Sequence, residues 1–491
     1  MTFIIKTEST HLIVTSLLLA GLNVGCISSP PNQQHLEDGL GAIQPVGTIG
    51  HVYSASSRFD ELESSVSYSG QIARHVLIAE LTSYIKGLDA QIDSTSPAPG
   101  SVSGAMNSYF LNDGDIRLEE PLSLSVGDAD PAACGLGTLQ TTLGDISSGK
   151  SLVGKLAGND IADGATVSVT DYLDWNDGVS FAGWTDIAIA ANGGSVDTPS
   201  GLVEAFFATI DTAAVARGEG LVELSPTGDE LPTYVTRDGL DLSQLVQKFL
   251  LGAVAYAQGT DDYLDDGTAG KGLDSPNTQD GEKLFTKLEH AWDEGFGYFG
   301  AARDYGDYTD EEAAGKGGRD DYANGFFDSN DDCLIDLTRE YNFGHSVNAS
   351  KRDLGAVAVT DFSKQAFDAF AAGRQLIANA GDELTANERS ELLAHRDVAV
   401  TAWENAIAST IVHYINEVLA DLDKLSQEAE DYSFVDHAKH WSELKGFALG
   451  LQFNPRSRLP RADFAQLHVH IGDAPVIEGS TVRALESLLE A

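Results

Sequence analysis

Residues 282–300 read EKLFTKLEHAWDEGFGYFG, and our fold assignment starts from this stretch. Its first part places apolar residues at helical spacing, which predicts an amphipathic helix. Its second part alternates aromatic residues with Gly295, Gly297 and Gly300. A glycine inside a helix costs about 1 kcal/mol relative to alanine. These glycines therefore indicate either close packing between helices or a ligand lying against exposed backbone.

Helical patterns recur along most of the chain. Apolar residues repeat at helical spacing in five further segments, 69–88, 240–258, 359–380, 387–425 and 437–451. Long acidic loops lie at 260–280 and 304–332, and the strand signal at 465–471 is short and isolated. We therefore predict a mostly α fold, with one or more helical bundles and long acidic loops.

The length of the chain sets the domain organisation. A chain of 491 residues can bury one large core or two to three smaller ones. We expect a helical domain over residues 51–475, with possible halves at 51–258 and 281–475. Residues 476–491 would form a C-terminal tail.

The charge of the chain restricts its partners. The formal net charge is −45, with 75 acidic against 30 basic residues, and 42% of the residues are hydrophobic. Such a field repels nucleic acid and attracts cations. We therefore expect no nucleic-acid partner. The charge can equally serve as a solvated acidic surface that keeps the protein soluble.

The amino terminus predicts export. Lys6 precedes a short apolar run from Leu12 to Leu22, which is too short to span a bilayer and fits a signal peptide over residues 1–25. The sequence LNVGC ending at Cys26 resembles a lipoprotein cleavage box, with Asn23 where leucine is usual. We predict that Cys26 is lipidated and that residues 26–50 form a flexible tether. The expected location is the outer membrane or periplasm, with a plain signal peptide and a soluble or secreted product as the alternative.

Two cysteines remain if Cys26 carries a lipid. Cys134 and Cys333 would then be an even pair in an oxidising compartment. A bond between them is one expectation, and two free thiols are the other, because the sequence gives no distance between them.

The loop Asp328-x-Asn330-x-Asp332-x-x-x-Asp336 is the clearest cation candidate. Ca²⁺ takes six to eight oxygen ligands, and side chains at positions 1, 3, 5 and 9 of a tight loop can converge on one ion. Cys333 stands where a helix-loop-helix calcium site has glycine, and Arg339 stands where that site has its closing glutamate. We predict a looser Ca²⁺ loop. In the alternative interpretation, these side chains only cap turns and helices.

Two His/Glu pairs form a second metal candidate. His290 and Glu294 are four residues apart, and His440 and Glu443 are three apart, so each pair shares one face of a predicted helix. Imidazole with carboxylate suits Zn²⁺ or Fe²⁺ if the two helices meet. In the alternative interpretation, each histidine forms a local hydrogen bond and each glutamate pairs with a lysine or arginine.

Further charged and aromatic residues predict a structural or ligand cleft. Its members are Trp292, Asp293, Arg303, Glu340, Asn348, Lys351, Arg352 and Trp441. The bases among them can neutralise Asp293, Asp304, Asp353 or Glu340 in buried pairs, which often lie in functional clefts and are otherwise structural.

Four segments carry a family resemblance. They are YSGQIARH at 68–75, HAWDEGFGYFG at 290–300, NASKRD at 348–353 and HWSELKGF at 440–447. Their order over residues 45–470 resembles the DUF4856 family of bacterial envelope lipoproteins, which has no known activity. The chain is also distantly similar to imelysin-like iron-regulated surface proteins, helical bundles with a Gly-x-His-x-x-Glu motif. Here Ala438 replaces the glycine before His440 and Glu443. This similarity implies two imelysin-like halves and iron as a ligand.

These features predict an envelope lipoprotein that binds a cation or a metal-bearing ligand, with iron or calcium as the metal, during uptake. Its partners would be the membrane, through the lipid, and envelope transport proteins. One alternative is a metal-dependent hydrolase with Glu294 or Glu443 as general base. Another is a helical interaction module in which the Ca²⁺ loop is structural.

Overall fold

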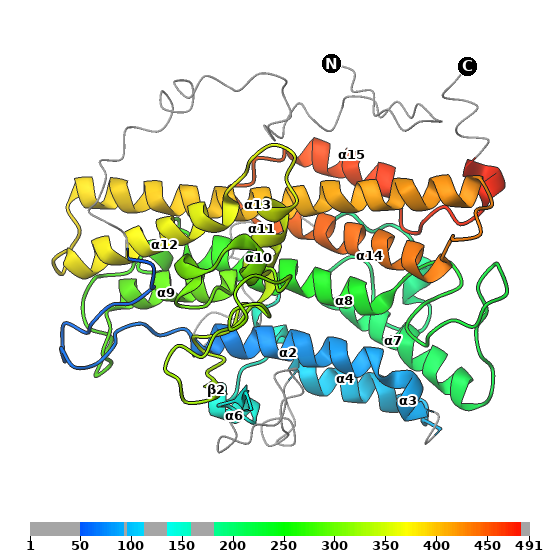
Figure 1. Cartoon of the computed structure of the whole chain (residues 1–491), viewed down its shortest axis with the longest axis horizontal. Helices are drawn as coiled ribbons and strands as arrows, with labels where there is room; N and C mark the ends of the chain where they lie inside the picture. The colour runs from blue at the N-terminus through cyan, green and yellow to red at the C-terminus, as the bar shows by residue number, and fades with distance from the viewer. Residues whose placement is uncertain (1–49, 93–95, 112–134, 159–180, 483–491) are drawn as a thin grey trace.

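The computed structural model of the protein describes residues 50–92, 96–111, 135–158 and 181–482 (Figure 1). The predicted signal peptide, Cys26, Cys134 and the last nine residues of the chain lie outside these ranges. The mostly α prediction is confirmed. The longer α-helices are α2 (Ser69–Lys86), α4 (Ser101–Leu111), α7 (Pro199–Gly218), α8 (Leu242–Leu250), α9 (Lys287–Phe299), α11 (Gly344–Leu354), α12 (Phe362–Asn379), α13 (Ala386–Ser426), α14 (Phe434–Gly450) and α15 (Arg461–Ile471).

Short elements connect these helices. The one-turn α-helices are α3 (Leu88–Ile92), α6 (Leu143–Ile146) and α10 (Asp310–Ala313). The 3₁₀ turns are η2 (Val153–Lys155), η5 (Ile187–Ala190), η8 (Gly272–Asp274), η9 (Tyr305–Asp307) and η10 (Leu451–Phe453). In the described part of the chain, the paired strands are β1 (Gly137–Thr138) and β2 (Leu334–Ile335), which run parallel with Gly137 opposite Leu334. The two acidic loops therefore contain short helical turns.

Helix α13, with 41 residues, is the longest of the described helices and contacts both parts of the bundle. It packs against both α12 and α14, which lie end to end beneath it in Figure 1. Helix α9 packs under α12 and α8 packs under α14, while α2 contacts both α8 and α9. The molecule therefore contains two neighbouring stacks, one with α12 and α9 and one with α14 and α8, which α13 and α2 hold together.

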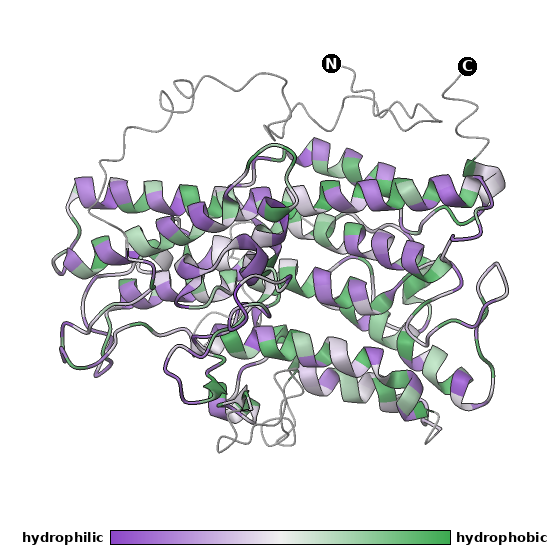
Figure 2. Ribbon diagram, in the orientation of Figure 1, coloured by the Kyte–Doolittle hydropathy of each residue, from purple (hydrophilic) through white to green (hydrophobic). Residues whose placement is uncertain are grey.

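Local sequence explains why α13 and α9 form. Thr385 and Glu388 build a capping box at the start of α13, and Thr286 and Glu289 build another at the start of α9. Along α13, Ala402, Ala406, Ile407, Ile411 and Val418 are buried, as the predicted apolar stripe requires. Figure 2 shows hydrophobic and hydrophilic residues alternating along this helix.

One large hydrophobic core runs through the described residues. It includes Tyr53 and Val76 from the first expected half and Trp292, Trp403 and Phe447 from the second. The family-like stretch at 290–300 lies in this core rather than on the surface. The two expected halves therefore share their buried side chains.

The glycines of α9 allow close packing. A Cβ atom on Gly295 would lie 2.8 Å from the side chain of Leu264, and one on Gly297 would lie 2.7 Å from the Cβ of Tyr68. Gly300 ends the helix with a φ of +88°, a left-handed conformation that favours glycine. Of the two interpretations of these glycines, close packing is the one observed.

Two segments differ from their predicted form. The buried segment 240–258 begins as α8 but continues as two π-helical stretches, η6 (Leu251–Tyr256) and η7 (Gln258–Tyr263). The isolated strand signal at 465–471 does not correspond to a strand, because these residues belong to helix α15, which buries Phe464, Leu467 and His468 at helical spacing. Among the described helices, none is both long and apolar enough to cross a membrane.

Candidate functional site

His290 and Glu294 share one face of α9, beside the start of α2. His290 Nδ1 lies 3.0 Å from the carbonyl oxygen of Ser67, and His290 Nε2 lies 3.6 Å from Glu294 Oε2. The other carboxylate oxygen of Glu294 accepts a hydrogen bond of 2.7 Å from Gln71 Nε2. Burial raises the pKa of Glu294, and the charge of His290 opposes that rise. The predicted pair is therefore present, with Gln71 as an additional partner.

His440 and Glu443 lie on α14 and have different partners. His440 Nδ1 is 2.8 Å from Asp421 Oδ2, and the hydrogen bond to this carboxylate raises the pKa of His440. Glu443 Oε1 lies 3.5 Å from Lys248 Nζ on α8. Helix α14 belongs to the stack with α8, whereas α9 belongs to the stack with α12 (Figure 1).

The two pairs therefore do not combine into the four-residue metal site considered from the sequence. Within residues 50–92, 96–111, 135–158 and 181–482, no three His, Cys, Asp or Glu side chains gather as metal ligands. The described residues thus do not fit an iron or zinc centre built from His290, Glu294, His440 and Glu443. The physical reason is the packing of α9 and α14 in separate stacks, where local hydrogen bonds and a lysine engage the four side chains.

Asp293 and Trp292 lie in the core next to α12. Arg374 Nε donates a hydrogen bond of 2.8 Å to Asp293 Oδ1, and Arg374 Nη1 donates one of 3.0 Å to Glu289 Oε1. The hydroxyl of Tyr53 donates to Asp293 as well, over 2.8 Å. Trp292 Nε1 donates to the carbonyl of Phe370. This network is structural, and sequence reasoning missed Arg374 and Tyr53 because no local pattern connects them to Asp293.

The bases expected in the cleft pair differently from the prediction. Arg303 donates to the carbonyl of Val66 and lies 5.6 Å from the ring centre of Tyr68. Burial and the nearby positive charge of Lys248 together lower the pKa of Lys351 to about 8. Burial also lowers the pKa of Arg352, while the charge of Glu443 opposes that change.

Asp353 and the remaining expected cleft residues lie at separate packing contacts. Asp353 accepts the backbone N–H groups of Phe362 and Ser363 at the start of α12. Asn348 is half-buried on α11, on the same helix as Lys351 and Arg352. The buried Trp441 of α14 donates to the carbonyl of Ile471. The eight expected cleft residues are thus spread over several packing contacts instead of lining one cleft.

The acidic loop at 328–336 folds into a tight turn. Asp328 accepts the backbone N–H groups of Asp332, over 3.2 Å, and of Cys333, over 2.7 Å. Asn330 Nδ2 donates a hydrogen bond of 3.0 Å to Asp332 Oδ2, and both residues are exposed to solvent. Asp331 and Cys333 have φ angles of 59° and 65°. The chain therefore takes the left-handed conformation at Cys333 that glycine supplies in a calcium loop.

Asn330 Oδ1 accepts the backbone N–H of Asp332, and Asp332 Oδ1 accepts that of Leu334. Asp336 and the neighbouring Glu340 have protein partners as well. Asp336 pairs with Arg339 over 3.0 Å and accepts hydrogen bonds from Gln140 and Thr338. Glu340 accepts bonds from Ser329 and from the backbone of Asp336. The carbonyls of Cys333 and Ile335 bind β1, so the alternating strand directs the Leu334 carbonyl away from β1. Cys333 is disulfide-bonded. The loop itself thus offers Asp328, Asn330, Asp332 and the Leu334 carbonyl.

A basic pocket surrounds His290 and Glu294. It has a volume of about 300 Å³ and lies between the start of α2, residues 147–155, and α9. Arg74, Lys150, Lys155 and Lys283 line it against the carboxylates of Glu294 and Asp280. We call it the α2 pocket. Its bases were missed because they are scattered over more than 200 residues of an acidic chain, and the helical spacing found only His290 and Glu294.

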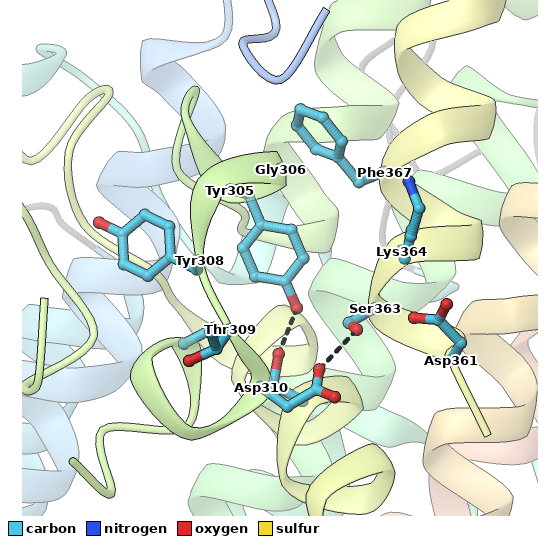
Figure 3. Close-up of a pocket in the computed structure, with 11 residues that line it drawn as sticks. Tyr305, Gly306, Tyr308, Thr309, Asp310, Asp361, Ser363, Lys364 and Phe367 are labelled. Atoms are coloured by element: carbon cyan, nitrogen blue, oxygen red, sulfur yellow. Dashed lines mark hydrogen bonds between the residues drawn. The ribbon is translucent and has the colours of Figure 1, made fainter. Parts of the chain in front are cut away.

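A second pocket lies beside η9 and the start of α12 (Figure 3). It has a volume of about 260 Å³. Tyr305 forms a hydrogen bond with Ser350, and Asp310 accepts one of 2.8 Å from Ser363. Burial raises the pKa of Asp310, and the charge of Asp353 adds to that rise. Two carboxylates, Asp310 and Asp361, and one base, Lys364, line the pocket, so its charge balance differs from that of the basic α2 pocket.

Comparison with known proteins identifies a family without an assigned activity. Searches of curated proteins and of solved structures gave no match. The family described as "Domain of unknown function (DUF4856)" matches residues 194–458. This range contains the resembling segments at 290–300, 348–353 and 440–447, and the segment at 68–75 lies outside it. The chain therefore belongs to the DUF4856 family.

Proposed function

We propose that the protein is an exported envelope protein, anchored through Cys26, that binds Ca²⁺ at the loop of Asp328, Asn330 and Asp332 and takes part in cation uptake. The observation that carries the proposal is the turn itself. Asp328 accepts the N–H of Cys333, and the exposed side chains of Asn330 and Asp332 are hydrogen-bonded to each other. These are oxygen ligands of the kind that Ca²⁺ prefers.

The expected affinity follows from the ligand count. Two carboxylates, one amide oxygen and one backbone carbonyl leave the remaining positions of a Ca²⁺ ion to water. Because affinity rises with the number of charged ligands, a dissociation constant of about 10⁻⁴ to 10⁻³ M is expected, the range of extracellular modules. This range suits an exported protein, and a disulfide at Cys333 is typical of an oxidising compartment.

Calcium is expected to raise the melting temperature, and Asp332→Ala is expected to abolish that rise. At ten times the dissociation constant, one bound ion stabilises the folded state by about 1.4 kcal/mol. The measurement is thermal unfolding with increasing CaCl₂, with MgCl₂ at the same ionic strength as a comparison. Isothermal titration calorimetry gives the affinity directly.

Asp331→Asn is the matched control. This substitution removes one charge from the same loop, and asparagine tolerates the φ of 59° at this position. This variant is expected to keep the Ca²⁺-dependent rise. An equal rise in all three proteins would mean that Ca²⁺ acts through the general acidic surface, and the proposed site would be rejected.

A second candidate is an interaction module whose loop is structural. It is favoured by the attachment of the loop, since Gly137 and Leu139 donate to the carbonyls of Cys333 and Ile335. In that case Ca²⁺ would protect residues 304–342 from limited proteolysis without any further ligand. The hydrolase alternative gains no support, because within the described residues no three His, Cys, Asp or Glu side chains form a group that could hold a metal ion.

A further inference from the structure

The α2 pocket is a second site with the opposite charge preference. Arg74 is 8% exposed, and its guanidinium donates to the backbone carbonyls of Ser151 and Gly70. Within the described part of the chain it forms no salt bridge. A buried charge without a counter-ion is costly, so a positive group at the wall of a cavity is a place for an anion.

A second base adds to the charge of Arg74. The side chain of Lys150 lies along the start of α2, where a Cβ atom on Gly70 would come within 3.0 Å of Lys150 Cε. Burial and the charge of Arg74 lower the pKa of Lys150, and the charge of Glu294 opposes that change. The two cations therefore repel each other across the pocket, and a bound anion would relieve that repulsion.

The start of α2 contributes backbone donors. Tyr68, the residue before the helix, makes no side-chain capping bond to the first turn. The N–H groups of that first turn carry the positive end of an 18-residue helix. Ser69 and Gly70 also line the pocket. A helix start beside an arginine and a lysine is the arrangement that binds oxyanions.

Glu294 narrows the class of anion. Its Oε1 is occupied by Gln71, while Oε2 faces His290 across 3.6 Å and is free to accept a second hydrogen bond. A carboxylate repels ligand carboxylate and sulfate, which carry no proton near neutral pH. A phosphate group loses its second proton near neutral pH, so it can still donate a hydrogen bond to Glu294.

We propose that the α2 pocket binds a phosphate group, with Arg74, Lys150 and the first turn of α2 as donors and Glu294 as the acceptor. The volume of about 300 Å³ leaves space beyond the phosphate itself for an organic part. Phe285 and Tyr263 line the remaining wall and offer aromatic surface to such a part. This proposal is independent of the Ca²⁺ loop, which shares no residue with the pocket.

The test is calorimetric titration of the purified protein at pH 7 with inorganic phosphate, glycerol 3-phosphate and sulfate at matched ionic strength. One-to-one binding of either phosphate, with sulfate at least about 10-fold weaker, is expected because sulfate lacks the proton that Glu294 accepts. Binding of both phosphates would show that the phosphate group suffices, and binding of the ester alone would show that an organic phosphate is the ligand. Binding of neither, or equal affinity for sulfate, would overturn the assignment.

Substitutions distinguish phosphate binding in the α2 pocket from non-specific attraction to basic side chains elsewhere on the protein. Arg74→Met and Lys150→Met are each expected to weaken phosphate binding about 10- to 100-fold, since each removes a charge-assisted hydrogen bond. Lys364→Met is the control, because Lys364 is an exposed base paired with Asp368 far along the chain. If Arg74→Met does not fold, as its circular dichroism melt would show, Lys150→Met carries the test, since Lys150 is half-buried. Equal losses in Lys364→Met would rule the pocket out.

Discussion

Arg374→Ala is expected to lower the free energy of unfolding by about 3–5 kcal/mol, the usual loss when one partner of a buried ion pair is removed. Arg374 is 1% exposed and binds Asp293 and Glu289, which are equally buried. Without the guanidinium, Asp293 remains in the core with only neutral hydrogen bonds, and Glu289 keeps its longer ion pair of 3.8 Å with Arg58. The charge of Arg374 lowers the pKa of Asp293 against the effect of burial, so its loss also favours protonation of that carboxyl.

Chemical denaturation followed by far-ultraviolet circular dichroism measures this loss. Lys424→Ala is the control, because Lys424 pairs with Asp431 at an exposed site where a salt bridge contributes about 0–1 kcal/mol. The double variant Arg374→Met with Asp293→Asn is expected to recover part of the loss, since it removes both charges. If Arg374→Ala costs no more than Lys424→Ala, the network does not hold α9, α12 and the segment before α2 together.

The helical fold could be predicted from the sequence because the signals for helices are local. The capping box of Thr385 and Glu388 and the apolar stripe of α13 lie within single turns of the chain. The short strand signal at 465–471 shows the limit of such reasoning. Its alternation is seven residues long, and a run this short fits a strand and a helix equally well. Tertiary packing favours the helix here, because α15 buries Phe464, Leu467 and His468 on one face.

The candidate sites also differ in whether local sequence or the fold brings their residues together. The turn of Asp328 and Asp332 was predicted because all its bonds form within five residues. Whether His290 meets His440 depends on how two helices far apart in the sequence pack, and α9 and α14 pack in different stacks. Arg374 binds Asp293 across 81 positions of the chain. The bases of the α2 pocket carry no pattern in the sequence, because only the fold brings Arg74 and Lys150 to Glu294.

Asp304→Asn is expected to stabilise the protein at pH 8 and to leave its stability at pH 4 nearly unchanged. Asp304 is 8% exposed, and neither of its carboxylate oxygens has a hydrogen-bond partner among the described residues. Burial, together with the charges of Asp307 and Glu340, raises its pKa from the ordinary 3.8 to about 7. Arg319 opposes this rise, and the hydroxyl of Tyr308 nearby is also unpartnered within the described part of the chain.

The sign of the effect follows from proton binding. Between pH 4 and pH 7 the folded protein keeps the proton of Asp304, while the unfolded chain has released it, so stability falls as the pH rises. Three pKa units at about 1.4 kcal/mol each give a loss of about 4 kcal/mol by pH 8. Asparagine removes that loss because it stays neutral at every pH. Denaturation at pH 4, 6 and 8 measures it, with Asp320→Asn as the control that removes an exposed charge elsewhere in the same acidic loop. Parallel stability curves for the wild type and Asp304→Asn would mean that Asp304 is ionised and solvated, and its burial would then not control the stability of this region.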